Sequence, residues 1–411
     1  MKQILSISLS PNVESDDVSA AASMLVQPWN WRKKGFVREV EQWFVQKFPE
    51  YTVRSFNSGR SALFEICKAF NLQRGDEVLV QAFTCVAVPN SILWAGATPI
   101  YVDIDTTLNL DLKDAERKIT SKTKAILVQH TLGLTVDMRA VLSFARKHNI
   151  LVIEDCAHAL GASYNSKLLG SFGDASFFSF GRDKVLSSVF GGMGFIQHKH
   201  TAAVKRFVTS HTFLPKPKMY WILQQLLHPL LFSIILPIYR SGIGKLLLVL
   251  FQKLTLLSFP VYPEEKKGHR PMDFPAQFPN ALARLLLVQL SKLEIYNERR
   301  KNAAQLYIDA FRSNKKITLL TYPAGSIFLR FPVLVKNPDI VLRNAKKEGI
   351  LLGNWYHNVI DPVGTEFSKI AFNESKTPVA SRISGQIINL PTNIPESGVR
   401  RVIHFLQNTS L

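Results

Sequence analysis

The stretch from Ile150 to Gly194 constrains the fold of this 411-residue chain more than any other. Its hydrophobic residues Leu151-Val152-Ile153 lead into Glu154-Asp155, the pattern of a buried strand that ends in acid. A second hydrophobic run, Ala175–Phe180, is followed four residues beyond its end by a lysine, Lys184. Glycines separate these runs and provide turns at low steric cost. We therefore expect a strand with a carboxylate at its end, and a lysine on the loop after the next strand.

Upstream of this stretch, strand and helix patterns alternate. Strands are predicted at Asp76–Val80, Thr98–Ile104 and Lys124–His130, and helices at 86–95 and 137–147. This alternation predicts a parallel sheet with helices on both faces, in which ligands bind at the carboxyl ends of the strands. Asp155 and His130 both stand at such ends.

An acid at a strand end and one lysine on the next loop are what a pyridoxal phosphate (PLP) site requires. The acid keeps the pyridine nitrogen protonated, and the lysine forms a Schiff base and later moves a proton. Residues 53–70 add a short strand, a turn at Asn57-Ser58-Gly59 and a helix. Backbone N–H groups at the start of such a helix can bind an anion, although the same residues also fit a plain helix cap.

The chain resembles the DegT-type (DegT/DnrJ/EryC/StrS) sugar aminotransferases from about Val53 to Gly194, through the runs RGDEV at 74–78, AGATP at 95–99 and VDID at 102–105. The resemblance resumes more weakly at 276–307, 349–356 and 389–391. It implies an α/β, aspartate-aminotransferase-like protein of fold type I. Such a protein has a large domain with a mostly parallel, seven-stranded-type sheet flanked by helices, and a smaller α+β C-terminal domain. It also implies PLP-dependent transfer of an amino group from glutamate to a nucleotide-linked keto sugar, for surface polysaccharide or glycan precursors.

By that resemblance, Lys184 is the Schiff-base lysine and Asp155 the partner of the pyridinium nitrogen. His158 stands where the family has glutamine, facing the ring oxygen of the cofactor, and histidine can also donate a hydrogen bond there. The alternative is a histidine of the core. Cys85 stands where the family places an aromatic residue that stacks on the cofactor ring. A dehydratase-like PLP reaction and a non-catalytic, membrane-associated homologue remain as alternative functions; Lys184 argues against the first, because related dehydratases carry histidine there.

The resemblance also implies where the cofactor phosphate binds. Ser179 matches the phosphate-binding serine, and Gly59-Arg60 occupies the Gly-Thr position of the family. Pro275 and Gln277 replace an asparagine and an arginine that reach the phosphate in a neighbouring subunit. Arg182 or Arg60 is a candidate for the missing positive charge, with a surface role as the alternative for each.

Four segments are expected: an N-terminal arm at 1–52, a PLP-binding large domain at 53–212, a hydrophobic insertion at 213–274, and a linking helix (about 279–313) with a small domain at 275–411. Residues 219–239 of the insertion carry no charge. A single membrane crossing would place the two domains on opposite sides of the bilayer, which the fold forbids. We therefore expect a helical pair, either buried against protein or in peripheral membrane contact through 213–262, with basic residues on both sides: Lys216, Lys218, Lys266, Lys267 and Arg270.

The loop at Asn354-Trp355-Tyr356 groups polar and aromatic tips that suit a sugar, with inter-domain packing as the alternative. These three residues and His130 are the candidate substrate contacts. The sequence shows no zinc-type spacing, Walker loop or interleaved aromatic and basic motif. We therefore expect neither a metal nor a nucleic-acid partner.

Composition bears on compartment and partners. Cys67, Cys85 and Cys156 are few and widely spaced, and the first residues lack a sustained hydrophobic run, so a cytoplasmic protein with reduced thiols is expected. The net charge of +19 fits a solvated basic surface, and also attraction to nucleotide-linked substrates or to the inner face of the cell membrane. A homodimer is expected, because fold type I sites are usually completed by a second subunit.

Overall fold

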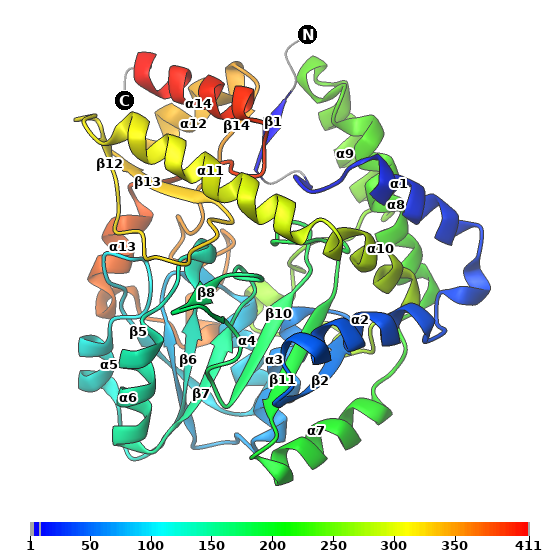
Figure 1. The fold of residues 1–411 in the computed structure, drawn as a ribbon, viewed down its shortest axis with the longest axis vertical. Coiled ribbons are helices and arrows are strands. Elements are labelled where there is room, and N and C mark those ends of the chain that lie inside the picture. The colour runs from blue at the N-terminus through cyan, green and yellow to red at the C-terminus, as the bar shows by residue number, and fades with distance from the viewer. Residues whose placement is uncertain (1–3, 8–9, 410–411) are drawn as a thin grey trace.

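A seven-stranded sheet forms the centre of the protein, in the order β2-β11-β10-β7-β6-β3-β5 (Figure 1). The computed structural model describes residues 4–7 and 10–409; residues 1–3 and 8–9 of the predicted arm, and 410–411, lie outside the described residues. The sheet strands are β2 (Tyr51–Phe56), β3 (Glu77–Gln81), β5 (Thr98–Val102), β6 (Thr123–Gln129), β7 (Leu151–Asp155), β10 (Ala175–Ser179) and β11 (Gly192–Gln197). Only β11 runs antiparallel to its neighbours, so the predicted mostly parallel α/β fold is confirmed.

Helices cover both faces of this sheet because its strands are hydrophobic on both sides. In β6, Ile126 and Val128 face one core, and Ala125 and Leu127 face the other, as the two-residue period of a strand requires. The first core is covered by α2 (Gly35–Lys47), α6 (Met138–His148) and α10 (Asn280–Leu290). The second is covered by α3 (Gly59–Ala69), α4 (Ala87–Ala95) and α7 (Thr201–Phe213).

The predicted long helix at 279–313 is two helices, α10 and α11 (Leu293–Phe311). The break at Ser291-Lys292 separates a helix that packs on the large domain from one whose second half enters the core of the small domain. The hydrophobic run at 326–335 forms a strand only in its second half, β13 (Phe331–Val335). Its first part instead joins the domains, since the N–H of Ile327 donates to the carbonyl of Gly133 (3.0 Å).

The small domain contains an antiparallel sheet of β12 (Ile317–Thr318), β13 and β16 (Ile387–Leu390), covered by α12 (Pro338–Lys347) and α14 (Glu396–Asn408). β15 (Ile360–Asp361) pairs with β4 (Thr84–Cys85) of the large domain, and β14 (Ile350–Leu351) with β1 (Leu5–Ser6). The remaining elements are α1 (Ser15–Leu25), α5 (Leu112–Lys118), α13 (Pro378–Ser384), β8 (Ser163–Tyr164), β9 (Lys167–Leu168) and the 3₁₀ turns Pro28–Asn30, Thr131–Gly133, Tyr239–Ser241, Glu265–Lys267, Phe367–Ile370 and Glu374–Lys376.

The hydrophobic insertion forms a helical pair, α8 (Met219–Ile235) and α9 (Ile243–Lys253). α8 packs against α1 and α10, and it buries Trp221 and Leu226 in the main core. α9 packs on the end of α8 and on the 3₁₀ turn Tyr239–Ser241, in a small cluster around Phe232, and lies at the periphery of the protein (Figure 1). Within residues 4–7 and 10–409, no helix has both the length and the hydrophobicity to span a membrane.

Candidate active site

A pocket opens where β7 and β10 end, between the large domain and the loop after β14. Asp155 is the last residue of β7, and Ser179 is the last residue of β10. The pocket brings together most of the residues selected from the sequence: Gly59, Arg60, Cys85, Asp155, His158, Ser179, Arg182, Lys184, Trp355 and Tyr356. Residues that are up to 297 positions apart in the chain therefore meet at one sheet edge.

The amine of Lys184 lies 2.8 Å from Nε2 of His158. The backbone N–H of Leu132 donates to Nδ1 of the same ring (3.2 Å), so a neutral imidazole carries its proton on Nε2. Nε2 then donates to the amine of Lys184, which must be unprotonated to accept. The pKa values agree: burial lowers the pKa of His158 well below its ordinary value, and burial also lowers the pKa of Lys184. Both the contact with His158 and burial therefore favour the unprotonated, nucleophilic form of the Lys184 amine.

Asp155 is a buried carboxylate, with only 3% of its surface exposed. Its Oδ1 accepts a hydrogen bond from the N–H of Ala157 (3.0 Å). Burial outweighs that bond and is the largest effect on this group, and it raises the pKa of Asp155 to about 6. A cation placed against this carboxylate would lower the pKa again, so the site is suited to a positively charged ring nitrogen.

The start of α3 and the end of β10 form a small cradle. A Cβ added at Gly59, the first residue of α3, would lie 2.8 Å from Cβ of Ser179, so only glycine permits this approach. A Cβ at Gly192 would lie 2.5 Å from the backbone nitrogen of Gly59. The free N–H groups at the start of a helix, together with a serine hydroxyl, can bind a phosphate group.

Aromatic side chains of the small domain form one wall. The rings of His158 and Trp355 are stacked, with centroids 5.6 Å apart and planes 18° apart, and Tyr356 stacks on Trp355. Nζ of Lys184 lies 5.3 Å from the centroid of Trp355. Cys85 also lines the pocket, and burial raises the pKa of its thiol, which therefore stays protonated. Trp355 and Tyr356 thus supply the aromatic surface that Cys85 lacks.

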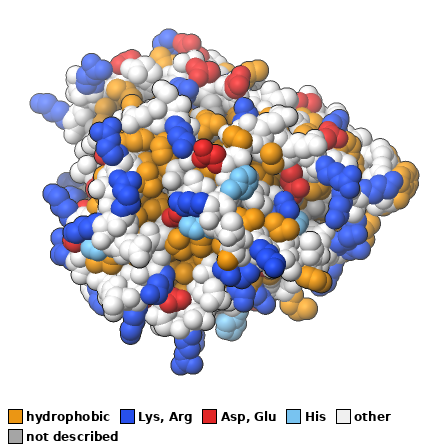
Figure 2. Space-filling view, turned by 60° about the horizontal axis from the view of Figure 1, so that its bottom comes forward, with side chains coloured by type: hydrophobic (Ala, Val, Ile, Leu, Met, Phe, Trp, Pro, Cys, Tyr) orange, Lys and Arg blue, Asp and Glu red, His pale blue; other side chains and the backbone are white. Residues whose placement is uncertain are grey.

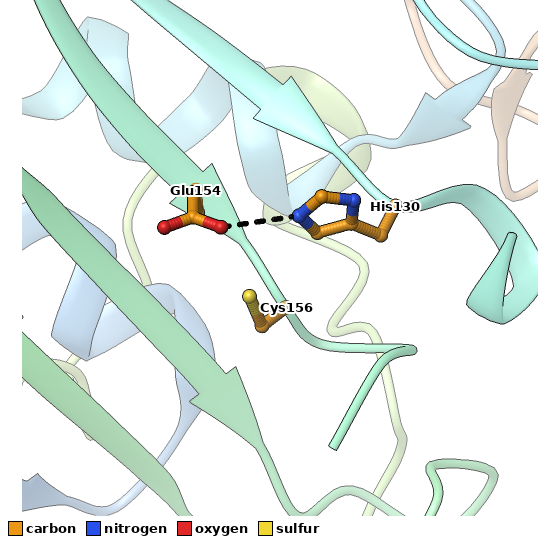
Figure 3. Close-up of side chains that lie close together, drawn as sticks. All are labelled: His130, Glu154 and Cys156. Atoms are coloured by element: carbon orange, nitrogen blue, oxygen red, sulfur yellow. Dashed lines mark hydrogen bonds and ion pairs between the residues drawn. The ribbon is translucent and has the colours of Figure 1, made fainter. Parts of the chain in front are cut away.

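His130 does not lie in this pocket, which corrects its assignment as a substrate contact. It is fully buried beside Glu154 and Cys156 (Figure 3). Its Nδ1 accepts from the N–H of Val136 (3.3 Å), so Nε2 carries the proton and faces Glu154 at 3.4 Å. Glu154 in turn accepts three backbone N–H groups, from Gly170, Phe172 and Gly173. Hydrogen bonding within the core accounts for this cluster, although its three donor types could suit a metal ion. Asn354 likewise stands outside the lining of the pocket.

Sequence reasoning missed several lining residues. Thr84 and Gln129 line the pocket and are hydrogen-bonded to each other, but strand ends of this kind carry no distinct sequence signal. Pro260 and Val261, which stand in the segment predicted as an insertion, also line the pocket. Nothing in a hydrophobic segment predicts that contact. Arg330 was also missed; it stands outside the lining of the pocket but supports it, because its guanidinium lies 3.3 Å from the ring centroid of Trp355.

A neutral lysine beside a buried carboxylate, a phosphate-type cradle and a fold type I sheet define the class of PLP-dependent aminotransferases. The DegT/DnrJ/EryC1/StrS aminotransferase family matches residues 12–226 and 252–407, and the chain belongs to this family. The unmatched residues 227–251 cover the end of α8 and most of α9, so this part of the insertion is foreign to the family pattern.

Three similar proteins illustrate the comparison. GDP-perosamine synthase of Escherichia coli O157:H7 is 36% identical over 184 residues, which are 44% of this chain and 50% of that protein. The chain thus matches half the length of that relative. UDP-N-acetyl-3-dehydro-alpha-D-glucosamine 3-aminotransferase of Acidithiobacillus ferrooxidans is 28% identical over 360 residues, 86% of this chain and 82% of that protein. Among solved structures, the PLP form of Spr1654 from Streptococcus pneumoniae has a TM-score of 0.72 and 20% identity, covering 98% and 97% of the two chains.

Proposed function

We propose that the protein transfers an amino group from glutamate to a nucleotide-linked keto sugar, with PLP as cofactor, for surface polysaccharide or glycan precursors. The observation that carries this proposal is the hydrogen bond between Nε2 of His158 and the amine of Lys184 (2.8 Å), in the same pocket as the buried Asp155. A lysine is a nucleophile only when its amine is unprotonated. A hydrogen bond donated by the buried His158 favours that form.

The residues present fit PLP. Lys184 would hold the cofactor covalently, Asp155 would face its ring nitrogen, and Ser179 with the start of α3 would hold its phosphate. When bound, the cofactor supplies an electron sink that stabilises a carbanion next to the transferred nitrogen. The buried Asp155 would favour a protonated ring nitrogen, because a carboxylate in a low-dielectric site attracts a cation strongly.

The other residues position groups and move protons. Nε2–H of His158 is aimed at the reacting end of the pocket, where it donates a hydrogen bond and stays neutral because burial disfavours its charged form. The amine of Lys184 can take up and return a proton at the same place. The stacked rings of Trp355 and Tyr356 give that side of the pocket an aromatic wall.

Support for the substrate class comes from the names of relatives. They include a GDP-perosamine synthase and an aminotransferase acting on a UDP-linked 3-dehydro sugar. The test is to offer glutamate with a panel of nucleotide-linked keto sugars and to detect the amino sugar by mass spectrometry. A panel that yields no amino sugar, with protein that carries PLP, would contradict the proposal.

We also propose that α9 contacts an anionic membrane surface at the inner face of the cell membrane. Its outer face exposes Ile243, Leu246, Val249, Leu250 and Leu254 at fractions of 42% to 69%, and Lys245 and Lys253 stand among them. This combination of exposed hydrophobic and basic side chains is typical of helices that lie in the membrane interface. Figure 2 brings forward the end of the protein opposite to α9, where Lys and Arg side chains also lie among hydrophobic ones, in keeping with the net charge of +19.

Liposome flotation tests this surface. The protein is expected to float with anionic vesicles, and high salt should weaken the binding because it screens the lysines. Leu246→Ser with Leu250→Ser should reduce binding by at least about tenfold, through the hydrophobic area lost. Ile295→Ser, which removes an equally exposed side chain of α11, serves as the matched control. If the protein never floats, the membrane proposal is wrong, and we would then infer that the exposed face of α9 packs against a second copy of the chain.

The remaining partner assignments are also proposals. A homodimer fits the exposure of Trp29 (67%) and Phe213 (82%), and light scattering measures it. A cytoplasmic location fits the three free cysteines, of which Cys67 and Cys156 are buried.

A further inference from the structure

Arg60 and Arg182 both line the pocket. They differ in whether a carboxylate pairs with the guanidinium. Arg60 forms an ion pair with Glu265 of the insertion, whose side chain is fully buried. Nη2 of Arg60 also donates to the carbonyl of Pro260 (2.6 Å). The positive charge of Arg60 is therefore neutralised within the protein.

Arg182 has no such partner among the residues that the structure describes. Its Nη2 donates to the hydroxyl of Ser258 (2.6 Å), its guanidinium lies 5.6 Å from the ring centroid of Phe190, and its buried Nε has no acceptor. The neighbouring carboxylate of Asp183 faces Arg330 instead, at 3.9 Å. Burial lowers the pKa of Arg182 to about 10, because the charged guanidinium lacks compensation. An anion bound in the pocket would compensate the positive charge of Arg182.

The backbone that carries Arg182 wraps around the cradle. A Cβ added at Gly181 would lie 3.7 Å from Oγ of Ser179 and 3.6 Å from Cγ of Lys184. Arg182 thus lies on the segment that joins the cradle serine to the lysine. Arg182 lines the same pocket as the start of α3, where helix N–H groups favour the same kind of ligand.

The insertion holds Arg182 through a buried polar chain. The hydroxyl of Ser258 accepts from Arg182 and donates to Oε1 of Gln225 on α8 (2.7 Å). Ser258 is 4% exposed and Gln225 is fully buried, and Nε2 of Gln225 donates to the carbonyl of Trp221 (2.8 Å). The orientation of the guanidinium is therefore fixed from α8, within one chain.

We propose that Arg182 binds the phosphate group of PLP, and that Ser258 of the insertion is the positioning residue that aims it. This assignment rests on the proposed function. A guanidinium matches phosphate oxygens with two parallel N–H groups and keeps its charge in a buried site. The diphosphate of a nucleotide sugar offers the same chemistry; the position of Arg182 beside Ser179 and the start of α3 favours the cofactor.

Comparing PLP with pyridoxal, which lacks the phosphate, isolates the contact. Both ligands are titrated into wild type, Arg182→Gln, Arg182→Lys and Ser258→Ala, and binding is followed by the visible absorbance of the ligand. Arg182→Gln should weaken PLP binding by about 30-fold and leave pyridoxal binding within about twofold. Arg182→Lys should recover part of the loss, and Ser258→Ala should show a smaller loss of the same pattern. Arg117→Gln, an exposed arginine of α5 (67% side-chain exposure), is the matched control.

The pyridoxal measurement also reports on folding, since that ligand needs an intact pocket around Lys184. Equal losses for both ligands, or no loss for either, would overturn the assignment. Unchanged PLP binding with a raised KM for the nucleotide sugar would assign Arg182 to the substrate diphosphate instead. A wild-type protein that binds neither ligand would contradict the proposed function rather than the role of Arg182.

Discussion

Replacing Lys184 with alanine is expected to abolish covalent attachment of PLP and to reduce transamination by at least about a thousandfold. Lys184 is the only lysine between Lys167 and Lys199, so no near neighbour in the sequence can take its place. Its amine is also the one that contacts Nε2 of His158, at 2.8 Å. Borohydride reduction followed by peptide mass spectrometry should find the cofactor on the peptide containing Lys184 in wild type, and on no peptide in the variant.

The matched control for this experiment is Lys167→Ala, which removes an exposed lysine outside the pocket. It should retain both the trapped cofactor and the activity. Circular dichroism checks that the Lys184 variant is folded. If that variant still traps the cofactor on the same peptide, or keeps wild-type turnover, Lys184 is not the attachment site.

Asp155→Asn should have the second large effect, with opposite consequences for function and stability. The amide keeps the hydrogen bond from Ala157 but loses the charge that holds the ring nitrogen protonated. We expect turnover to fall by about a hundredfold or more, with a much smaller change in PLP binding. Near-normal turnover would mean that Asp155 has only a structural role.

The stability effect follows from the pKa. Burial raises the pKa of Asp155 in the folded protein from the ordinary 3.8 to about 6, so between these pH values the folded chain binds more protons than the unfolded chain. Stability from this group is therefore present below about pH 4 and is lost as the pH rises through 6. This increase in the pKa of Asp155 corresponds to about 3 kcal/mol in the free energy of unfolding.

Without added PLP, Asp155→Asn should thus be more stable than wild type at pH 7, by up to about 3 kcal/mol, and no more stable at pH 4. Added PLP should stabilise wild type more than the variant, because the ring nitrogen compensates the carboxylate. Chemical denaturation at both pH values, with and without PLP, measures this. A variant that is less stable at pH 7 would show that burial of the charge is not the dominant effect.

Local patterns predicted the sheet well. Strands β3, β6 and β7 and helices α3, α4 and α6 stand within about three residues of their predicted bounds, because buried parallel strands are short hydrophobic runs and their flanking turns are rich in glycine. Asp155 and Ser179 could be placed at a common sheet edge because parallel strands share their carboxyl ends. The break between α10 and α11 could not be predicted, since it depends on which domain each half packs against.

Long-range partners set the rest of the candidate site. The sequence left Arg60 and Arg182 equivalent, and the difference between them depends on Glu265, 205 positions from Arg60. His130 follows the end of a strand as expected, yet its ring is fully buried and faces Glu154 in the core. The sequence places the residue at the sheet edge but does not determine which way its side chain points. The contact of the insertion with the pocket likewise depends on tertiary packing, which a run of hydrophobic residues does not encode.

Transfer of nitrogen-15 from labelled glutamate to a nucleotide-linked keto sugar tests the central claim most directly. Wild-type protein carrying PLP is incubated with the labelled donor and the sugar, and the mass of the product is measured by mass spectrometry. The account predicts an amino sugar that carries the label in wild type and none with Lys184→Ala. A wild-type protein that holds PLP on Lys184, yet moves no label from glutamate to any sugar of the panel, would contradict it.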